Sequence, residues 1–246
     1  MTEPALYRLL TWSSPGYPTG AFSYSHGLEW AVETGSVSDL QGLLDYVTAV
    51  LERGGGWIDA VLFAHAWRAT CDGRIASAEI VADSPCARKQ LTPALCEVAA
   101  LAAAFRGTSE TALESRQQGA AFLDVTRRAW PHPTLDAFAQ QSATHNTPVA
   151  HCMAVAVACA AHGIGLEPAL QAYVHAVAAN LVSAGARLIP LGQTQAQIAI
   201  AQLSPTLSNI TRRALSTSLD DLGTAAPAIE ICSLRHETQY TRLFRS

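Results

Sequence analysis

Apolar residues recur along this chain at the spacing of an α-helix. The clearest stripe follows the 3.6-residue period of one helix face. Its members are Leu40, Leu43, Leu44, Val47, Val50 and Leu51. The preceding Ser38-Asp39-Leu40-Gln41 has the pattern of a capping box, in which the Ser38 hydroxyl accepts from a free backbone amide and Gln41 reaches back. Gly54-Gly55-Gly56 ends the stripe, and we expect it to be a turn between two helices.

Three further helix starts share one pattern, a hydroxyl residue followed by proline. They are Thr92-Pro93, Thr147-Pro148 and Ser204-Pro205. A hydroxyl N-cap satisfies a free amide, and proline is favoured at the first helical position because it lacks an N–H group. We expect the three helices to run to Gly107, Gly163 and about Ser216.

The remaining pattern is also helical. Residues 57–71, 110–129, 168–186 and 227–236 are expected to form helices, and residues 72–91 a helix with a loop around Ser84-Pro85. No segment alternates convincingly between apolar and polar residues, as a strand would. The chain is therefore predicted to be all-α, a single-domain compact helical bundle of about ten helices over residues 1–246.

Two segments do not fit a simple bundle. Residues 13–20 are too rich in proline and glycine to be helical and stand among aromatic residues. Residues 235–246 combine charges with large apolar groups, among them Tyr240, Leu243 and Phe244. This tail either packs on its own domain or docks on a partner, and the sequence leaves both open.

Composition excludes disorder. Hydrophobic residues make up 49% of the chain and charged residues 15%, which is well below the roughly 25% of an ordinary soluble domain. Either the core is large or apolar surface is kept for partner proteins. The net charge is −4 and Lys89 is the only lysine, so the clustered basic surface of a nucleic-acid-binding protein is absent.

The expected location is the cytoplasm. The N-terminus, Met-Thr-Glu-Pro, lacks the pattern of a secretory signal, and the apolar run of residues 149–161 is too short to span a membrane. The six cysteines contain no C-x-x-C pair, so we expect reduced, mostly buried thiols.

No catalytic motif is visible. The sequence has no Walker phosphate loop, no G-x-G-x-x-G after a strand and no G-x-S-x-G elbow. The acidic pairs Asp220-Asp221 and Glu110 with Glu114 are interpreted as residues at turns and helix starts, where the helix dipole favours anions. We therefore expect no catalytic residue.

Histidines and cysteines gather in one region without an obvious metal site. His145, His151 and Cys152 are close in sequence, but His162 lies three turns from His151 on the same expected helix. We expect no stably bound metal and no other cofactor. One alternative stays open: a Cys/His hydrolase that uses Cys152 with His151 or His175.

Four segments, in order along the chain, have the form of a family signature. Residues 14–29 contain Ser14-Pro15 and then Pro18-Thr19-Gly20-Ala21-Phe22-Ser23-Tyr24-Ser25-His26-Gly27-Leu28-Glu29. Glu110-Thr111 is followed by Arg116-Gln117-Gln118-Gly119. Residues 180–194 include Arg187-Leu188-Ile189-Pro190-Leu191-Gly192-Gln193-Thr194, and residues 233–246 form the fourth segment. Together they resemble the UreF family of urease accessory proteins over the length of the chain.

The resemblance implies a non-catalytic, all-α scaffold that is usually dimeric. Such a protein joins UreD (also called UreH) and the GTPase UreG on apo-urease, where GTP hydrolysis is coupled to nickel insertion, and it influences the GTPase. We expect the nickel to be handled by the complex as a whole, and a free-standing nickel-binding chaperone stays open as an alternative. We place partner contacts at residues of the loop, the third segment and the tail, since Tyr, Phe and Arg are typical interface anchors. These are Tyr24, Arg187, Gln193, Arg235, Tyr240, Arg242, Leu243 and Phe244.

Overall fold

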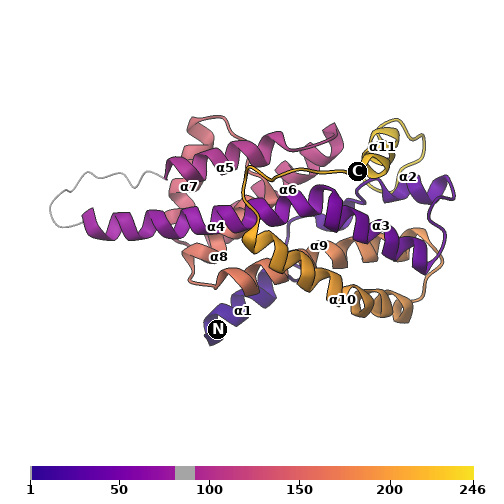
Figure 1. Cartoon of the computed structure of the whole chain (residues 1–246), viewed down its shortest axis with the longest axis horizontal. Coiled ribbons are helices and arrows are strands. Elements are labelled where there is room, and N and C mark those ends of the chain that lie inside the picture. Colours follow the sequence, from indigo (N-terminus) through magenta and orange to yellow (C-terminus); the bar gives the residue numbers. More distant parts are fainter. Residues whose placement is uncertain (1, 81–91) are drawn as a thin grey trace.

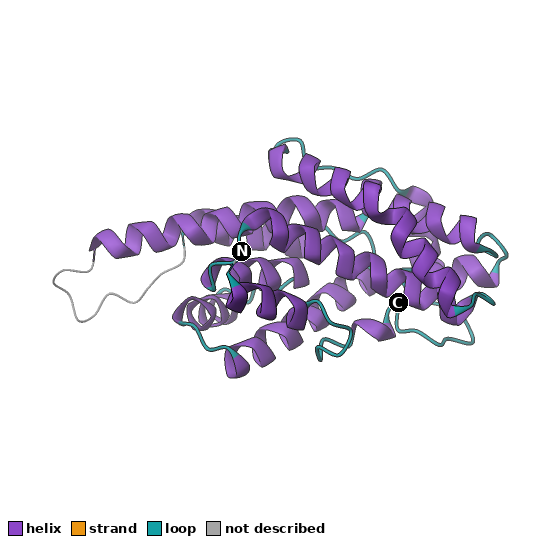
Figure 2. Ribbon diagram, turned by 90° about the horizontal axis from the view of Figure 1, so that it is seen from below, coloured by secondary structure: helices purple, strands orange, loops and turns teal. Residues whose placement is uncertain are grey.

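The computed structural model describes residues 2–80 and 92–246, which form eleven α-helices, one 3-10 helix and no strand (Figures 1 and 2). The predicted all-α class is confirmed for these residues. The elements are α1 (Glu3–Trp12), η1 (Ala21–Ser23), α2 (Leu28–Glu33), α3 (Leu40–Arg53), α4 (Gly55–Ile80), α5 (Pro93–Ala104), α6 (Ser109–Ala129), α7 (Pro133–Thr144), α8 (His151–Ala161), α9 (Leu166–Leu188), α10 (Gln193–Ser216) and α11 (Pro227–His236). None of the described helices is both long and apolar enough to cross a membrane.

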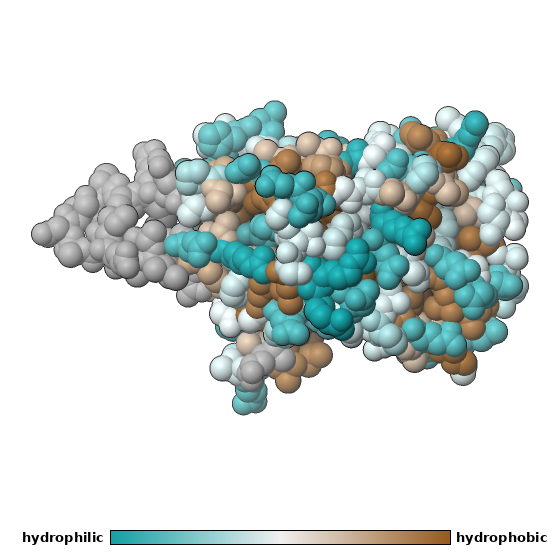
Figure 3. Space-filling model, in the orientation of Figure 1, coloured by the Kyte–Doolittle hydropathy of each residue, from teal (hydrophilic) through white to brown (hydrophobic). Residues whose placement is uncertain are grey.

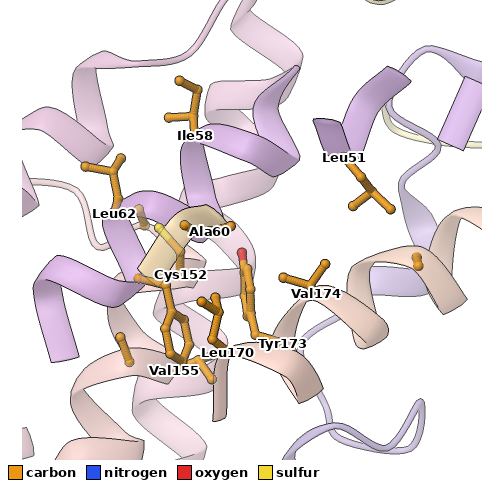
Figure 4. Close-up of a cluster of buried hydrophobic side chains, with 14 of the residues drawn as sticks. Leu51, Ile58, Ala60, Leu62, Cys152, Val155, Leu170, Tyr173 and Val174 are labelled. Carbon is orange, nitrogen blue, oxygen red and sulfur yellow. The ribbon is translucent and has the colours of Figure 1, made fainter. Parts of the chain in front are cut away.

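Two helices, α4 and α8, occupy the centre of the molecule. Every residue of α8 from Cys152 to Ala161 is buried, as are most residues of α4 between Trp57 and Ala66. A helix that is apolar on all sides is stable only when other helices surround it. Accordingly, α4 packs against α3, α5, α8, α9 and α10 (Figure 1), and Figure 4 shows side chains of α4, α8 and α9 meeting in the core.

Several predicted helix boundaries are confirmed. Helix α5 begins at Pro93, and the Thr92 hydroxyl caps it by accepting from the Leu95 amide at 3.2 Å. Helix α11 spans the predicted residues 227–236, and α6 and α9 lie within two residues of their predicted limits. The prediction for residues 72–91 is confirmed as helical to Ile80, and the loop proposed at Ser84-Pro85 lies outside the described residues.

The predicted caps of α3, α8 and α10 were wrong. Asp39, and not Ser38, caps α3, with its carboxylate accepting from the Gly42 amide at 2.8 Å. Helix α8 begins at His151 instead of Pro148, because residues 148–150 stay extended where they cross α6. Pro205 lies inside α10, which begins at Gln193. The helix continues through the proline because its buried face, including Leu203 and Leu207, is held in the core.

The prediction that all three glycines, Gly54 to Gly56, form a turn was also partly wrong. Only Gly54 lies between the helices, and Gly55 and Gly56 begin α4. A Cβ on Gly56 would lie 3.0 Å from the Leu51 Cα atom, so glycine permits the close approach of α3 and α4. The sequence patterns also missed α1, α2, α7 and the first half of α10.

The fold brings the N-terminal loop and the end of the chain to the same side of the molecule. Gly27, at the end of the loop (residues 13–27), lies against α11, and the C-terminal residue lies beside α11 (Figure 1). Gly27 has a φ of +77°, and a Cβ there would lie 2.6 Å from the backbone nitrogen of Ser233. A side chain would therefore push the loop away from α11.

Candidate partner-binding site

The N-terminal loop and the C-terminal tail (residues 237–246) are bound to each other. The Arg245 amide donates to the Ser23 carbonyl at 2.7 Å, and the Ser25 hydroxyl donates to the Ser246 carbonyl at 2.6 Å. The Ser246 hydroxyl in turn donates to Glu114 on α6 at 3.0 Å. We call the loop, the tail, and the side chains of α2, α6, α9 and α11 that hold them the loop–tail site.

One carboxylate, that of Glu29 at the start of α2, holds the tail backbone. It accepts from the amide of Leu243 at 2.6 Å and from the amide of Phe244 at 2.9 Å. Its Oε2 atom also lies 2.9 Å from Nε2 of His236. Because Glu29 is buried, its charge depends on these donors in place of water.

His236 is fully buried between two carboxylates. Its Nε2 atom faces Glu29, and its Nδ1 atom lies 2.8 Å from Oε2 of Glu110 on α6. Both ring nitrogens therefore have a carboxylate oxygen within hydrogen-bond distance. Arg242 adds a positive charge, with Nη1 3.0 Å from Oε1 of Glu110. The imidazole and the guanidinium are the polar partners that offset the desolvation of the two buried carboxyl groups.

Burial and pairing act in opposite directions on Glu110. Burial raises the pKa of this carboxyl, and the neighbouring His236 and Arg242 only partly offset the rise. Removing the side chain of His236 or of Arg242 would therefore favour the protonated acid and weaken the contact between α6 and the tail.

A second ion pair contacts the last residue of the tail. Nδ1 of His26, in the loop, is 3.0 Å from Oε2 of Glu114, which also accepts from Ser246 and from Gln118. Burial alone would raise the pKa of Glu114, but His26 and Ser246 outweigh it and the pKa is lowered. Burial likewise favours neutral His26, and Glu114 outweighs it, so the pKa of His26 is raised. Both shifts favour the charged forms of the pair.

Arg187, at the end of α9, joins the loop to the tail. Its Nη2 atom donates to the Phe22 carbonyl at 2.8 Å, and its guanidinium lies over the Phe244 ring, 4.3 Å from the centroid. Tyr24 is held from the other side, because its hydroxyl donates to the Gln117 side chain. These contacts fix the conformation of the loop as well as that of the tail.

The eight residues predicted to contact partners fall into three groups. Tyr24 and Phe244 are buried, so in this arrangement they shape the surface from beneath. Arg187 and Arg242 form the intramolecular contacts described above. The other four, Gln193, Arg235, Tyr240 and Leu243, are exposed. Gln193 is the first residue of α10, outside the loop–tail site as defined here.

The exposed members are accompanied by apolar residues of α11. Tyr240 is fully exposed and Leu243 is 65% exposed, and Ile231 and Leu234 on α11 are at least half exposed. Figure 3 shows apolar areas interspersed with polar ones on the face of the molecule seen in Figure 1. These exposed apolar side chains on α11 and on the tail that follows it make this part of the surface a candidate protein-binding site.

Sequence reasoning missed the residues that build the site from inside. Glu29, Glu110, Glu114, His26 and His236 were not among the predicted site residues, and the two α6 glutamates were interpreted as helix-start anions. The available signal was the spacing of Glu110, Glu114 and Gln118, which places all three on one face of α6. Their partners come from segments more than 80 residues away in sequence, which no local pattern reveals.

The structure argues against a nucleophilic Cys152. The thiol is fully buried in the core (Figure 4), where its polar neighbours are Asp59 and Arg106, and burial raises its pKa well above the ordinary value. The neighbouring His151 is partly buried, and desolvation lowers its pKa to about 4. A reactive cysteine needs an accessible thiolate, and this environment favours the neutral thiol.

No metal centre is built from the described residues. None of their His, Cys, Asp and Glu side chains form a group of three or more suited to a metal ion. In the loop–tail site, both ring nitrogens of His236 already face carboxylates.

Comparison with known proteins identifies the family. The family model for UreF matches residues 37–204 of the chain. A "Urease accessory protein UreF" from Granulibacter bethesdensis is 50% identical over 244 residues, which covers 99% of this chain and 95% of the relative. Proteins of the same name from Rhodopseudomonas palustris and a Bradyrhizobium species are 46% and 47% identical, over 98% and 100% of this chain and 92% and 95% of theirs. The chain therefore belongs to the UreF family.

Proposed function

We propose that this protein is a non-catalytic accessory protein in the maturation of urease. Its membership of the UreF family and the name shared by its relatives support this role. The buried thiol of Cys152 is consistent with it, because the best candidate for a catalytic nucleophile is held in its unreactive form.

The finer proposal is that the chain bridges UreD (UreH) and the GTPase UreG on apo-urease. In this role it supports GTP-dependent insertion of nickel, which is cargo of the assembly, and modulates the GTPase. We propose that the loop–tail site contacts UreD. A homodimer and a cytoplasmic location remain predictions.

One observation carries the proposal: the tail presents exposed apolar side chains on a backbone that is already fixed. Glu29 holds the amide of Leu243, whose side chain is 65% exposed. Binding through a preordered segment avoids much of the entropy loss that a disordered tail would suffer. The neighbouring aromatic group of Tyr240 is of the type that supplies most binding energy at interfaces.

The test is deletion of the gene in its host, followed by urease assays with and without excess nickel. We expect the deletion strain to accumulate urease protein that has little activity. Reintroducing the wild-type gene should restore urease activity. Full urease activity in the deletion strain would refute a role in maturation. Binding of UreD should be tested separately by co-purification, so that a wrong partner assignment is distinguished from a wrong function.

The nickel-chaperone alternative predicts a different result. Equilibrium dialysis of the isolated protein with nickel should give at most weak binding if the metal is handled by the assembly. Tight stoichiometric binding would favour a free-standing chaperone.

A further inference from the structure

A pocket beside the loop–tail site lies where α11 and the turn between α5 and α6 meet the start of α4. Its volume is about 230 Å3, much more than the roughly 10–15 Å3 that one water molecule needs. Helix α11 contributes Ile229, Glu230 and Ser233 to the wall, and the turn contributes Phe105 and Gly107. The pocket therefore has room for a side chain of another molecule.

Among the described residues that line the pocket, three have ionisable side chains, and two of these are paired. Arg106 lies 2.7 Å from Asp59, and Nδ1 of His26 lies 3.0 Å from Glu114. The third, Glu230, forms no ion pair or hydrogen bond through its carboxylate within the described part of the chain. The pocket thus keeps one uncompensated negative charge.

The carboxylate of Glu230 belongs to the wall of the pocket and does not extend into bulk solvent. Glu230 is partly buried, and a Cβ on Gly107, which lines the same pocket, would lie 3.0 Å from its Cδ atom and 3.1 Å from Oε1. Neither carboxylate oxygen is closed off from the surface. Because water screens a partly buried charge less than a fully exposed one, a cation at this carboxylate gains more than at an exposed acid.

The pocket-lining face of α11 continues into exposed apolar side chains. Leu234 follows Glu230 by one helical turn, so the two are neighbours on the helix surface. Leu234 and Ile231 are at least half exposed and belong to the candidate protein-binding surface described above. A protein that covers them is therefore within reach of Glu230.

We propose that this pocket receives a lysine or arginine side chain of the partner protein that binds the loop–tail site. The cationic group would pair with the Glu230 carboxylate, and the methylene groups would lie against apolar residues such as Phe105 and Ile229. The inference rests on the proposed function, in which this partner is UreD.

The test measures the affinity of purified UreD for the full-length protein in a titration at low and at high ionic strength. Glu230→Gln should weaken binding by about tenfold, because it keeps the shape of the side chain but removes a charge-assisted hydrogen bond. Glu230→Lys should weaken it further, since it places like charges together. The difference between the wild type and Glu230→Gln should shrink at high ionic strength. Both variants should melt nearly as the wild type does, because the carboxylate has no partner within the described part of the chain.

Glu167→Gln and Glu167→Lys are the matched controls, because Glu167 is an exposed acid near the start of α9 that does not line the pocket. Both should bind UreD as the wild type does. Equal affinity of the wild type and Glu230→Gln for UreD would overturn this inference alone, whereas no binding of UreD to the wild type would overturn the proposed partner together with it. Saturable nickel binding that is lost in Glu230→Gln would also overturn the inference, because a metal ion would then be the occupant.

Discussion

The Glu29 carboxylate and the His236 ring, 207 positions apart in sequence, meet at 2.9 Å in the interior. This contact joins the first turn of α2 to the last residue of α11. Because Glu29 also accepts two tail amides, a change at this residue should loosen the tail and leave the helical core intact.

We expect Glu29→Gln to destabilise the protein by about 3 kcal/mol, because it removes one charge from a buried ionic cluster. The glutamine carbonyl can replace only part of the acceptor capacity that the tail uses. Hydrogen exchange at the amides of Leu243 and Phe244 should accelerate strongly, and a urea titration gives the change in the free energy of unfolding.

Glu33→Gln is the control for this substitution, since Glu33 is exposed on the same helix. It should change stability and exchange very little. Unchanged protection of the two tail amides in Glu29→Gln would contradict the assigned role of this carboxylate.

Phe244→Ala should reduce stability, whereas Tyr240→Ala should leave stability unchanged and reduce binding of UreD. Phe244 is 4% exposed, and truncation of a buried aromatic residue removes about 3 kcal/mol of packing. Tyr240 is fully exposed, so its truncation should leave the melting temperature nearly unchanged. If Tyr240 is an anchor for UreD, Tyr240→Ala should reduce affinity by about tenfold or more in a titration with UreD. A marked loss of stability in Tyr240→Ala would show that this residue is structural.

Arg187→Lys should weaken the bond between loop and tail although the charge is kept. Lysine has no planar guanidinium to lie over Phe244 while it donates to the Phe22 carbonyl. We expect faster proteolysis near residues 20–24 and 240–246 at unchanged core stability. Arg212→Lys, at an exposed position of α10, is the control. Equal cleavage of both variants and the wild type would exclude the proposed role of the guanidinium.

The partly buried His151 predicts a specific pH dependence. Its pKa is lowered to about 4 in the folded protein, against about 6.5 in an unfolded chain. As the pH falls from about 6.5 to about 4, the unfolded state takes up a proton that the folded state does not, so stability decreases. At about pH 5.5 the loss should be about 1 to 2 kcal/mol relative to neutral pH.

This dependence can be isolated by substitution. His151→Phe should lose less stability than the wild type between pH 7.5 and 5.5 in urea unfolding, whereas His175→Gln, at an exposed site on α9, should match the wild type. The same pH dependence in all three proteins would mean that His151 is not held neutral by burial.

Local sequence signals predicted the parts of the fold that local chemistry decides. Thr92-Pro93 starts α5 because a hydroxyl cap and a proline act within one turn. Ser204-Pro205 has the same pattern but lies inside α10, where packing of Leu203 and Leu207 against the core outweighs it. The predicted helix start at Thr147-Pro148 was wrong for a related reason. Close contact of this segment with Gly119 on α6 delays the start of α8 to His151.

The sequence predicted the surface segments of the candidate site but not the buried ion pairs that hold them. The aromatic loop and the tail are visible in sequence as unusual segments, and the resemblance to a family marks them. The pairings of Glu29 and Glu110 with His236, and of Glu114 with His26, depend on tertiary contact between distant segments. The periodicity that finds helices contains no information about such partners.

The most direct test of the central claim is co-purification of UreD with the Tyr240→Ala, Leu243→Ala double variant, measured beside urease activity in cells that lack the chromosomal gene. The account predicts a variant that folds and melts like the wild type but retains little UreD and restores little activity. Normal UreD binding and full urease activity with this variant would contradict the claim that the protein works by presenting its tail to a partner.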